Sequence, residues 1–249
     1  MKILVTAVLL AGMAASGRGQ QAAAPTVTIP ASELAAMKAK LADWPQLERY
    51  RAENAALPPP AAGEKRVVFF GSSTTDNWGR NYGSVFFPDK PYVNRGISGQ
   101  TTPQMLVRFQ QDVVALHPAA VVILGGSNDI AGNTGPSTLE MVENNLRSIV
   151  AVAQANGIKM ILASQLPTLE FPWNKGTHPA PTLLALSAWE KEYAAVHGLE
   201  YVDYYSVLVG PDGGPKEGLS VDGLHPTAKA YALMAPLVEL AIDKAIGRR

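Results

Sequence analysis

Cysteine is absent from the 249 residues, and charge of either sign is scarce. Without cysteine the chain is not a disulfide scaffold, so its core has to be stable without covalent cross-links. Charged residues make up 17% of the sequence, below the roughly 25% usual for soluble domains, and 21 basic residues balance 21 acidic ones. A net charge of zero gives no field that would attract nucleic acid or an acidic membrane surface, so we expect neither as a partner.

Long apolar runs are also missing. No stretch reaches the roughly 18 residues that a helix needs to cross a bilayer, so we expect no transmembrane segment. The chain does have 47% apolar residues, which is enough for one sizeable core and predicts one main domain.

Residues 1–19 predict a secretory signal peptide. Lys2 precedes an apolar run over residues 3–11, and small residues follow that run. An amphipathic N-terminal segment is the alternative interpretation. Because no cysteine follows the run, we expect no lipid anchor there. The protein is therefore expected to be exported, either to the periplasm or out of the cell.

Residues 20–63 predict a linker and an N-terminal helical extension, and residues 64–249 predict the main domain. Helical patterns begin at Ser32 and at Pro45, and the second one ends at three consecutive prolines, residues 58–60.

The main domain alternates short apolar runs with amphipathic helical patterns. The runs, which are typical of buried parallel strands, cover residues 66–70, 92–93, 120–124, 158–163 and 199–202. Helices are predicted from Thr102 to about 116, from about 139 to Gly157, over 182–197 and over 227–246. This alternation predicts a doubly wound α/β sheet, in which a ligand binds at the carboxyl ends of the strands.

Polar residues follow the predicted strands at that edge. Ser72 and Ser73 come after the first strand, in a sharp turn into a helix. A serine there can expose its hydroxyl beside backbone N–H groups, although capping the helix is the ordinary role of such residues. Gly99 follows the second strand, where it exposes an N–H or simply forms a turn.

Asn128 follows the third strand, where its amide is a candidate donor and an Asx turn is the alternative. Asp222 lies three residues before His225, just ahead of the last helix, so the acid can hold one ring nitrogen and leave the other exposed. Each segment is weak alone. A serine, two amide donors and an Asp/His pair after successive strands are together typical of a serine hydrolase.

These segments resemble the sequence blocks of the SGNH/GDSL hydrolases, and their flanking residues resemble the exported bacterial, platelet-activating-factor acetylhydrolase-like branch. The resemblance implies a flavodoxin-like three-layer α/β/α sandwich with a mainly parallel five-stranded sheet, and ester or thioester hydrolysis without a metal or other cofactor. It also implies Ser73 as nucleophile, His225 as base and Asp222 as the acid that orients the base. The oxyanion donors are then Ser73, Gly99 and Asn128. Ser72 departs from the family pattern, which has an aspartate before the nucleophile.

Candidate substrate-binding residues for the rim of the site follow three of the strands. Trp78, soon after the serine turn, and Arg95, soon after the second strand, suit a sugar face or an anionic group, although a core position is the alternative for Trp78. Trp173 and His178 lie in an aromatic and proline-rich segment after the fourth strand, which is a candidate lining of the acyl or alcohol pocket. The expected function is a serine esterase that acts on small-molecule or carbohydrate esters, with short acyl groups such as O-acetyl. A lysophospholipase, a thioesterase and a non-catalytic glycan-binding module are the alternatives.

Overall fold

The computed structural model describes residues 2–5 and 27–247, and the chain divides into two compact units, Met1–Trp44 and Pro45–Arg249. In the first unit, β1 (Lys2–Val5) pairs antiparallel with β2 (Val27–Pro30), and α1 (Ala31–Ala42) follows directly. Apart from residues 2–5, the predicted signal peptide 1–19 lies outside the described residues. No helix in the described part of the chain is long and apolar enough to cross a membrane.

The second unit is built on a five-stranded sheet in which every strand pair is parallel. The strands are β3 (Val67–Gly71), β4 (Tyr92–Gly96), β5 (Ala120–Leu124), β6 (Lys159–Ala163) and β7 (Glu200–Val202). The second strand of this sheet along the chain, β4, is thus longer than the predicted residues 92–93. Its polar residue Asn94 is buried and donates to the carbonyls of Thr75 and Trp78. Asn94 is polar because it forms these internal hydrogen bonds, and not because it belongs to a loop.

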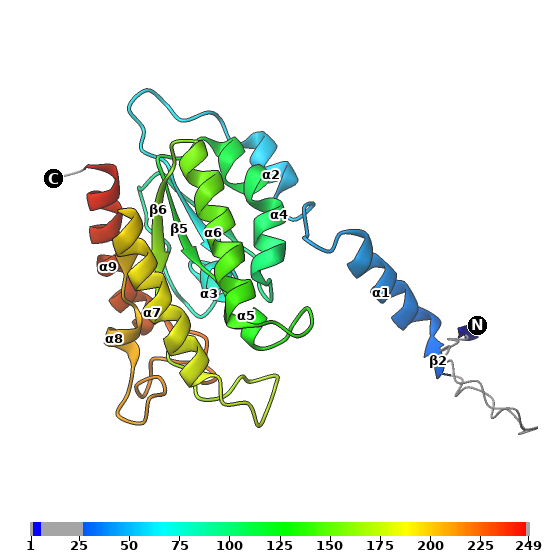
Figure 1. Ribbon diagram of the computed structural model, residues 1–249. Helices are drawn as coiled ribbons and strands as arrows, with labels where there is room; N and C mark the ends of the chain where they lie inside the picture. Colours follow the sequence, from blue (N-terminus) through cyan, green and yellow to red (C-terminus); the bar gives the residue numbers. More distant parts are fainter. Residues whose placement is uncertain (1, 6–26, 248–249) are drawn as a thin grey trace, which may run out of the picture. The chain divides into compact units, whose positions relative to one another are not determined.

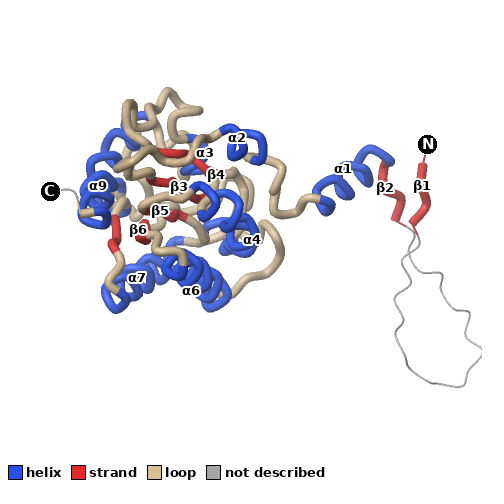
Figure 2. The backbone as a smooth tube through the Cα atoms, turned by 90° about the horizontal axis from the view of Figure 1, so that it is seen from above, coloured by secondary structure: helices blue, strands red, loops and turns tan. Residues whose placement is uncertain are grey.

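Helices cover both faces of the sheet, which gives the predicted three-layer sandwich (Figures 1 and 2). Val68, Phe70 and their neighbours face a core formed with α4, α6 and α7, whereas Val67 and Phe69 face a core formed with α9. The longer helices are α4 (Thr102–Asp112), α6 (Leu139–Ala155), α7 (Ala180–His197) and α9 (Ala228–Ile246). Both faces are apolar because both are buried, as is usual for a parallel sheet.

Short helices occupy the connections. They are α2 (Arg51–Ala56), α3 (Ser73–Asn77), a 3-10 turn at Val114–Leu116, α5 (Ser127–Ile130) and α8 (Tyr205–Leu208). The segment from Pro45 onward belongs to the sheet unit, so the structural break lies before Pro45 and not at the predicted boundary after residue 63. The reason is that Tyr50 is fully buried and Asn54 hydrogen bonds to Asp112 of α4.

The strand order is β4-β3-β5-β6-β7. The chain leaves β3 toward one side to form β4 and then crosses to the other side of β3 to form β5. Connections that leave the carboxyl ends of these neighbouring strands in opposite directions open a crevice between them, where open α/β sheets bind ligands. The segments that carry Ser73, Gly99 and Asn128 all begin at this edge.

Candidate active site

Ser73 is the first residue of α3, immediately after the end of β3. A side chain at Gly71 would collide with Thr75 and with the carbonyl of Leu124, so the strand-to-helix turn requires glycine here. Within the described chain, Ser72 occupies the N-cap position without forming a side-chain capping bond. The turn therefore exposes the Ser73 hydroxyl at the strand edge, and helix capping by Ser72 does not account for the serine pair.

Three side chains form a continuous hydrogen-bonded chain at this edge. The Nε2 atom of His225 lies 3.0 Å from Oγ of Ser73, a residue 152 positions away in the sequence. The Nδ1 atom of the same ring lies 2.7 Å from Oδ2 of Asp222. This is the geometry of a nucleophile, a base and an acid that orients the base.

A short closed loop holds the acid and the base together. The Oδ1 atom of Asp222 accepts hydrogen bonds from the backbone N–H groups of His225, at 2.8 Å, and Leu224, at 3.1 Å. Partial burial acts to raise the pKa of Asp222, but hydrogen bonds from the His225 ring and from these N–H groups outweigh it and lower the pKa below its ordinary 3.8. The carboxylate therefore stays ionised wherever the His225 ring is to serve as a base.

Gly99 and Asn128, which carry a backbone and a side-chain amide, line the same cleft as Ser73. Gly99 has a φ of +80°, and neither its N–H nor that of Ser73 has a hydrogen-bond partner within residues 27–247. The buried Asn128 amide donates one N–H to the carbonyl of Gln100 at 2.9 Å, and its oxygen accepts from Nδ2 of Asn133 at 2.9 Å. These two bonds fix the amide plane and leave its second N–H for another acceptor.

Asp129 lies next to Asn128 in the sequence, but its hydrogen bonds stabilise the fold. Its carboxylate accepts from the Thr102 N–H, at 2.9 and 3.1 Å, and from the Thr102 hydroxyl, at 2.5 Å, which ties α5 to the start of α4. Burial raises the pKa of Asp129, although the bonds from Thr102 act in the opposite direction.

Of the residues described above, Ser73, Gly99, Asn128, Asn133 and His225 line an open cleft of about 350 Å³. Two exposed aromatic rings lie near His225: the ring centroid of Tyr82 lies 6.4 Å from that of the imidazole, and that of Trp173 lies 6.3 Å from it. Trp173 stacks on Phe171, and its indole N–H donates to Asn133 at 3.1 Å, so its position is fixed from two sides.

The other predicted rim residues lie elsewhere, which corrects the sequence-based expectation for them. Trp78 is only 3% exposed, because its ring packs in the aromatic core around Phe69 and its indole N–H donates to Val85. Arg95 is 4% exposed and is bonded to Asn54 of α2. His178 is exposed but is not among the residues that line the cleft.

Four residues that line the cleft were not predicted from the sequence: Asn77, Tyr82, Ser98 and Asn133. Asn133 lies five positions after Asn128, and Tyr82 lies on the loop that follows the serine turn, so proximity to the recognised segments was the available signal. Tyr82 also has a φ of +57°, a conformation that nothing about a tyrosine predicts.

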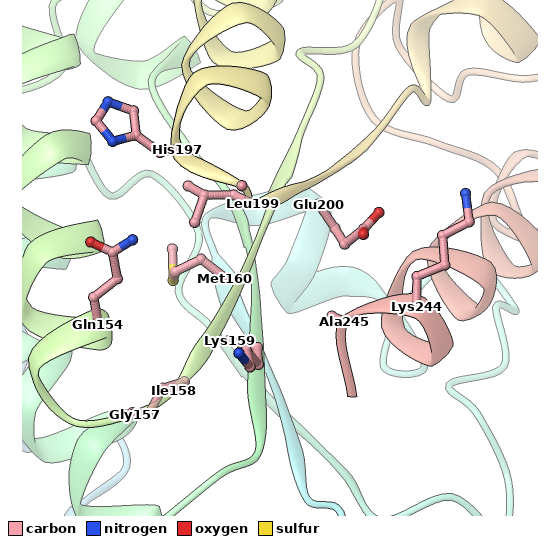
Figure 3. A pocket seen from close by; sticks show the side chains of 11 residues that line it. Gln154, Gly157, Ile158, Lys159, Met160, His197, Leu199, Glu200, Lys244 and Ala245 are labelled. Atoms are coloured by element: carbon pink, nitrogen blue, oxygen red, sulfur yellow. The ribbon is translucent and has the colours of Figure 1, made fainter. Parts of the chain in front are cut away.

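A second pocket, of about 450 Å³, opens at the opposite edge of the sheet, where strands begin and helices end. Figure 3 shows the side chains of Lys159, His197, Glu200 and Lys244 around it. Its described lining residues include no hydroxyl or thiol nucleophile. In residues 2–5 and 27–247, no three His, Asp or Glu side chains are grouped closely enough to hold a metal ion.

Comparison with known proteins identifies the family. The family model of the GDSL-like lipases and acylhydrolases matches residues 69–233, a stretch that runs from β3 into α9. The chain belongs to the GDSL-like lipase/acylhydrolase family. Members of this family are carboxylic ester hydrolases. A solved GDSL-like lipase from Bacteroides thetaiotaomicron is 42% identical to it, with a TM-score of 0.77 over 81% of this chain and 98% of that one.

Two curated proteins are also similar to this GDSL-family chain. Acetylxylan esterase of Xylanibacter ruminicola is 26% identical over 221 residues, which cover 75% of this chain and 45% of that protein. Esterase TesA of Pseudomonas aeruginosa is 30% identical over 142 residues, which cover 57% of this chain and 64% of that protein. The chain thus matches about half to two thirds of the length of these relatives.

Proposed function

We propose that the protein is a serine esterase that hydrolyses carboxylic esters through an acyl-enzyme, with Ser73 as nucleophile, His225 as base and Asp222 as the orienting acid. The observation that carries the proposal is the unbroken chain from Oγ of Ser73 through both ring nitrogens of His225 to Asp222. A serine hydroxyl is a poor nucleophile at neutral pH, and an imidazole within hydrogen-bond distance is what activates it.

The reaction follows from these positions. As Oγ of Ser73 bonds to the ester carbon, Nε2 of His225 takes the hydroxyl proton, and the ionised Asp222 stabilises the resulting imidazolium. Collapse of the tetrahedral intermediate breaks the bond to the alcohol, which leaves with the proton from His225. Water then attacks the acyl-serine, His225 takes a water proton, and this proton returns to Oγ as the carboxylic acid leaves.

Negative charge develops on the former carbonyl oxygen in both tetrahedral intermediates. The N–H groups of Ser73 and Gly99 and the free N–H of the Asn128 amide are the donors available to it in the cleft. Donors that are fixed before the reaction do not have to reorganise when the charge appears, so each is expected to contribute on the order of 10²- to 10³-fold in rate.

We further propose that the substrates are short-chain esters, with O-acetyl groups on carbohydrates as the preferred class. A cleft of about 350 Å³ suits a small acyl group. The exposed rings of Tyr82 and Trp173, 42% and 46% accessible, lie near His225 and offer flat apolar faces that suit a sugar. A similar protein, that of Xylanibacter ruminicola, is an acetylxylan esterase.

Hydrolysis of a 4-nitrophenyl ester series tests the chemistry. We expect turnover of the acetate to exceed that of the octanoate, and release of acetate from acetylated xylo-oligosaccharides. Ser73→Ala should abolish all of these activities without changing the fold, because a small residue at a helix start costs at most about 1–2 kcal/mol. The matched control Ser72→Ala should keep most of the activity.

Each other result has a definite meaning. Full turnover by the Ser73→Ala variant would refute the proposed nucleophile. A preference for long acyl chains would favour a lysophospholipase or thioesterase, and sugar binding without hydrolysis of any ester would favour a glycan-binding module.

Export of the protein remains our proposal and rests on the first 19 residues. Expression of the full chain in a Gram-negative host, followed by N-terminal sequencing of the periplasmic product, tests it. A product that stays in the cytoplasm with Met1 intact would contradict the proposal.

A further inference from the structure

The N–H of Gly99 is carried by a tight turn over residues 97–100. The N–H of Gln100 donates to the carbonyl of Ile97 at 3.3 Å, and the φ of Gly99 is +80°, as in a type II turn. Type I and type II turns differ by rotation of the central peptide unit, which here joins Ser98 to Gly99. That rotation would turn the Gly99 N–H to the opposite side, so the direction of this donor depends on what holds Ser98.

Asp76 holds Ser98 through both of its polar groups. The Oδ2 atom of Asp76 accepts from the Ser98 backbone N–H at 3.0 Å and from the Ser98 hydroxyl at 2.7 Å. The other carboxylate oxygen, Oδ1, accepts from Nη1 of Arg80 at 2.6 Å, which orients the carboxylate. Asp76 itself is not among the residues that line the cleft.

Asp76 lies on α3, three residues after Ser73, so it connects the helix of the proposed nucleophile to the turn of the proposed oxyanion donor. The two segments are in close contact: a side chain at Gly96, at the end of β4, would collide with the backbone of Asp76. Tyr50 supports the contact from the other side, since it donates to the carbonyl of Gly96 and accepts from Arg80.

The rest of the turn is held by the cleft amides. Asn133 donates to the carbonyl of Gly99 at 3.2 Å, and Asn128 donates to the carbonyl of Gln100 at 2.9 Å. These bonds fix the second half of the turn, whereas Asp76 is the side chain that fixes Ser98, in the first half.

We propose that Asp76 is a positioning residue for ester hydrolysis: its clamp on Ser98 keeps the Gly99 N–H directed at the oxyanion beside Ser73. The inference rests on the proposed esterase function and adds to it a residue that touches no substrate. Because the oxyanion forms only after attack, a misdirected Gly99 N–H weakens the transition state and leaves ground-state binding intact.

The test is steady-state kinetics of Asp76 variants on 4-nitrophenyl acetate. We expect Asp76→Ala to lower kcat by about 10- to 100-fold, with KM changed by less than about threefold, because a displaced donor costs less than a deleted one. Asp76→Asn keeps one acceptor oxygen for Ser98 and should recover part of kcat. Ser98→Ala should lower kcat in the wild-type background and cause no further loss in the Asp76→Ala background.

Glu143→Ala is the matched control for the lost ion pair. Glu143 pairs with Arg147 at i,i+4, as Asp76 does with Arg80, and the two acidic side chains are 16% and 18% exposed. The control removes a similar ion pair on α6 without touching the turn, and its kcat should equal that of the wild type.

Three outcomes would overturn the inference: an Asp76→Ala kcat within twofold of wild type, a loss confined to KM, or an equal loss in Glu143→Ala. If Asp76→Ala does not fold, the test uses Asp76→Asn and Ser98→Ala instead, and an unchanged kcat in both variants overturns the inference. Failure of the esterase proposal itself is recognised separately, because Ser73→Ala would then retain activity.

Discussion

Glu190 is a buried acid, and replacing it with glutamine should change how stability depends on pH. It lies on α7, is 2% exposed, and its Oε1 accepts from Nε2 of Gln165 at 3.0 Å. Its Oε2 has no partner among the described residues. Gln165 also donates to the carbonyl of Gly125, two residues before Ser127 begins α5, so the pair supports the loop that leads to Asn128.

Burial raises the pKa of Glu190 well above its ordinary 4.5, although the bond from Gln165 acts in the opposite direction. Above the unfolded pKa, the unfolded chain has lost this proton while the folded chain keeps it. The folded state then binds more protons, so stability is highest at acidic pH and falls as pH rises toward the folded pKa. The limiting slope for one proton is about 1.4 kcal/mol per pH unit.

Glu190→Gln removes this titration and preserves the size of the side chain. We expect its free energy of unfolding, relative to wild type, to increase from pH 5 to pH 7 at up to about 1.4 kcal/mol per pH unit. In thermal melts this corresponds to roughly 3–6 °C per pH unit for a chain of this size. Taking the difference between the two proteins cancels the titration of all other groups.

Glu192→Gln, at an exposed position on the same helix, is the matched control for the substitution itself. Parallel pH profiles for wild type and Glu190→Gln between pH 5 and 7 would refute the reasoning, because they would mean that the buried carboxyl is already ionised in the folded protein.

Further variants test the cleft. Asn128→Ala should lower kcat by about 10²- to 10³-fold with little change in KM, and an effect on KM alone would count against an oxyanion role. Asp222→Asn should lower kcat by on the order of 10⁴-fold, because an amide N–H in place of the carboxylate oxygen beside Nδ1 favours the wrong ring tautomer. Because the pKa of Asp222 is lowered on folding, its stabilising contribution is present above the unfolded pKa and is lost as pH falls through the folded one; equal acid melts for wild type and Asp222→Asn would contradict this. Trp173→Ala should raise KM for acetylated xylo-oligosaccharides several-fold more than for 4-nitrophenyl acetate. Trp189 stacks on Tyr193 outside the cleft, so Trp189→Ala should leave the ratio of these two KM values unchanged.

The predicted elements were accurate where local sequence decides structure. Thr138 and Thr227 cap their helices through their own side chains, and Gly198 ends α7 in the left-handed conformation. The prediction of one long helix from Thr102 to about 116 was wrong at its end, because α4 stops at Asp112 and a 3-10 turn follows. Asp112 is fully buried there against Arg108, a pairing that the helical pattern did not reveal.

Residues with two plausible environments were the ones that sequence could not assign. A tryptophan after the serine turn suits a sugar-binding rim as well as a core, and Trp78 lies in the core because four other aromatic rings pack around it, those of Phe69, Phe86, Phe87 and Tyr231. Tyr82, four positions later, reaches the cleft instead. The choice depends on contacts with α9, which lies about 150 residues further along the chain.

The sequence alone indicated the family, because its motifs resemble the sequence blocks of that family. It also determined the parallel α/β fold and the Asp222–His225 pair, because strand periodicity, helix caps and a three-residue spacing are local properties of the chain. Only the tertiary structure decided that α2 joins the sheet unit, that Trp173 and Tyr82 border the cleft, and that Asp76 reaches Ser98. Those contacts join segments far apart in the sequence, and they exist only once the strands have been brought into register.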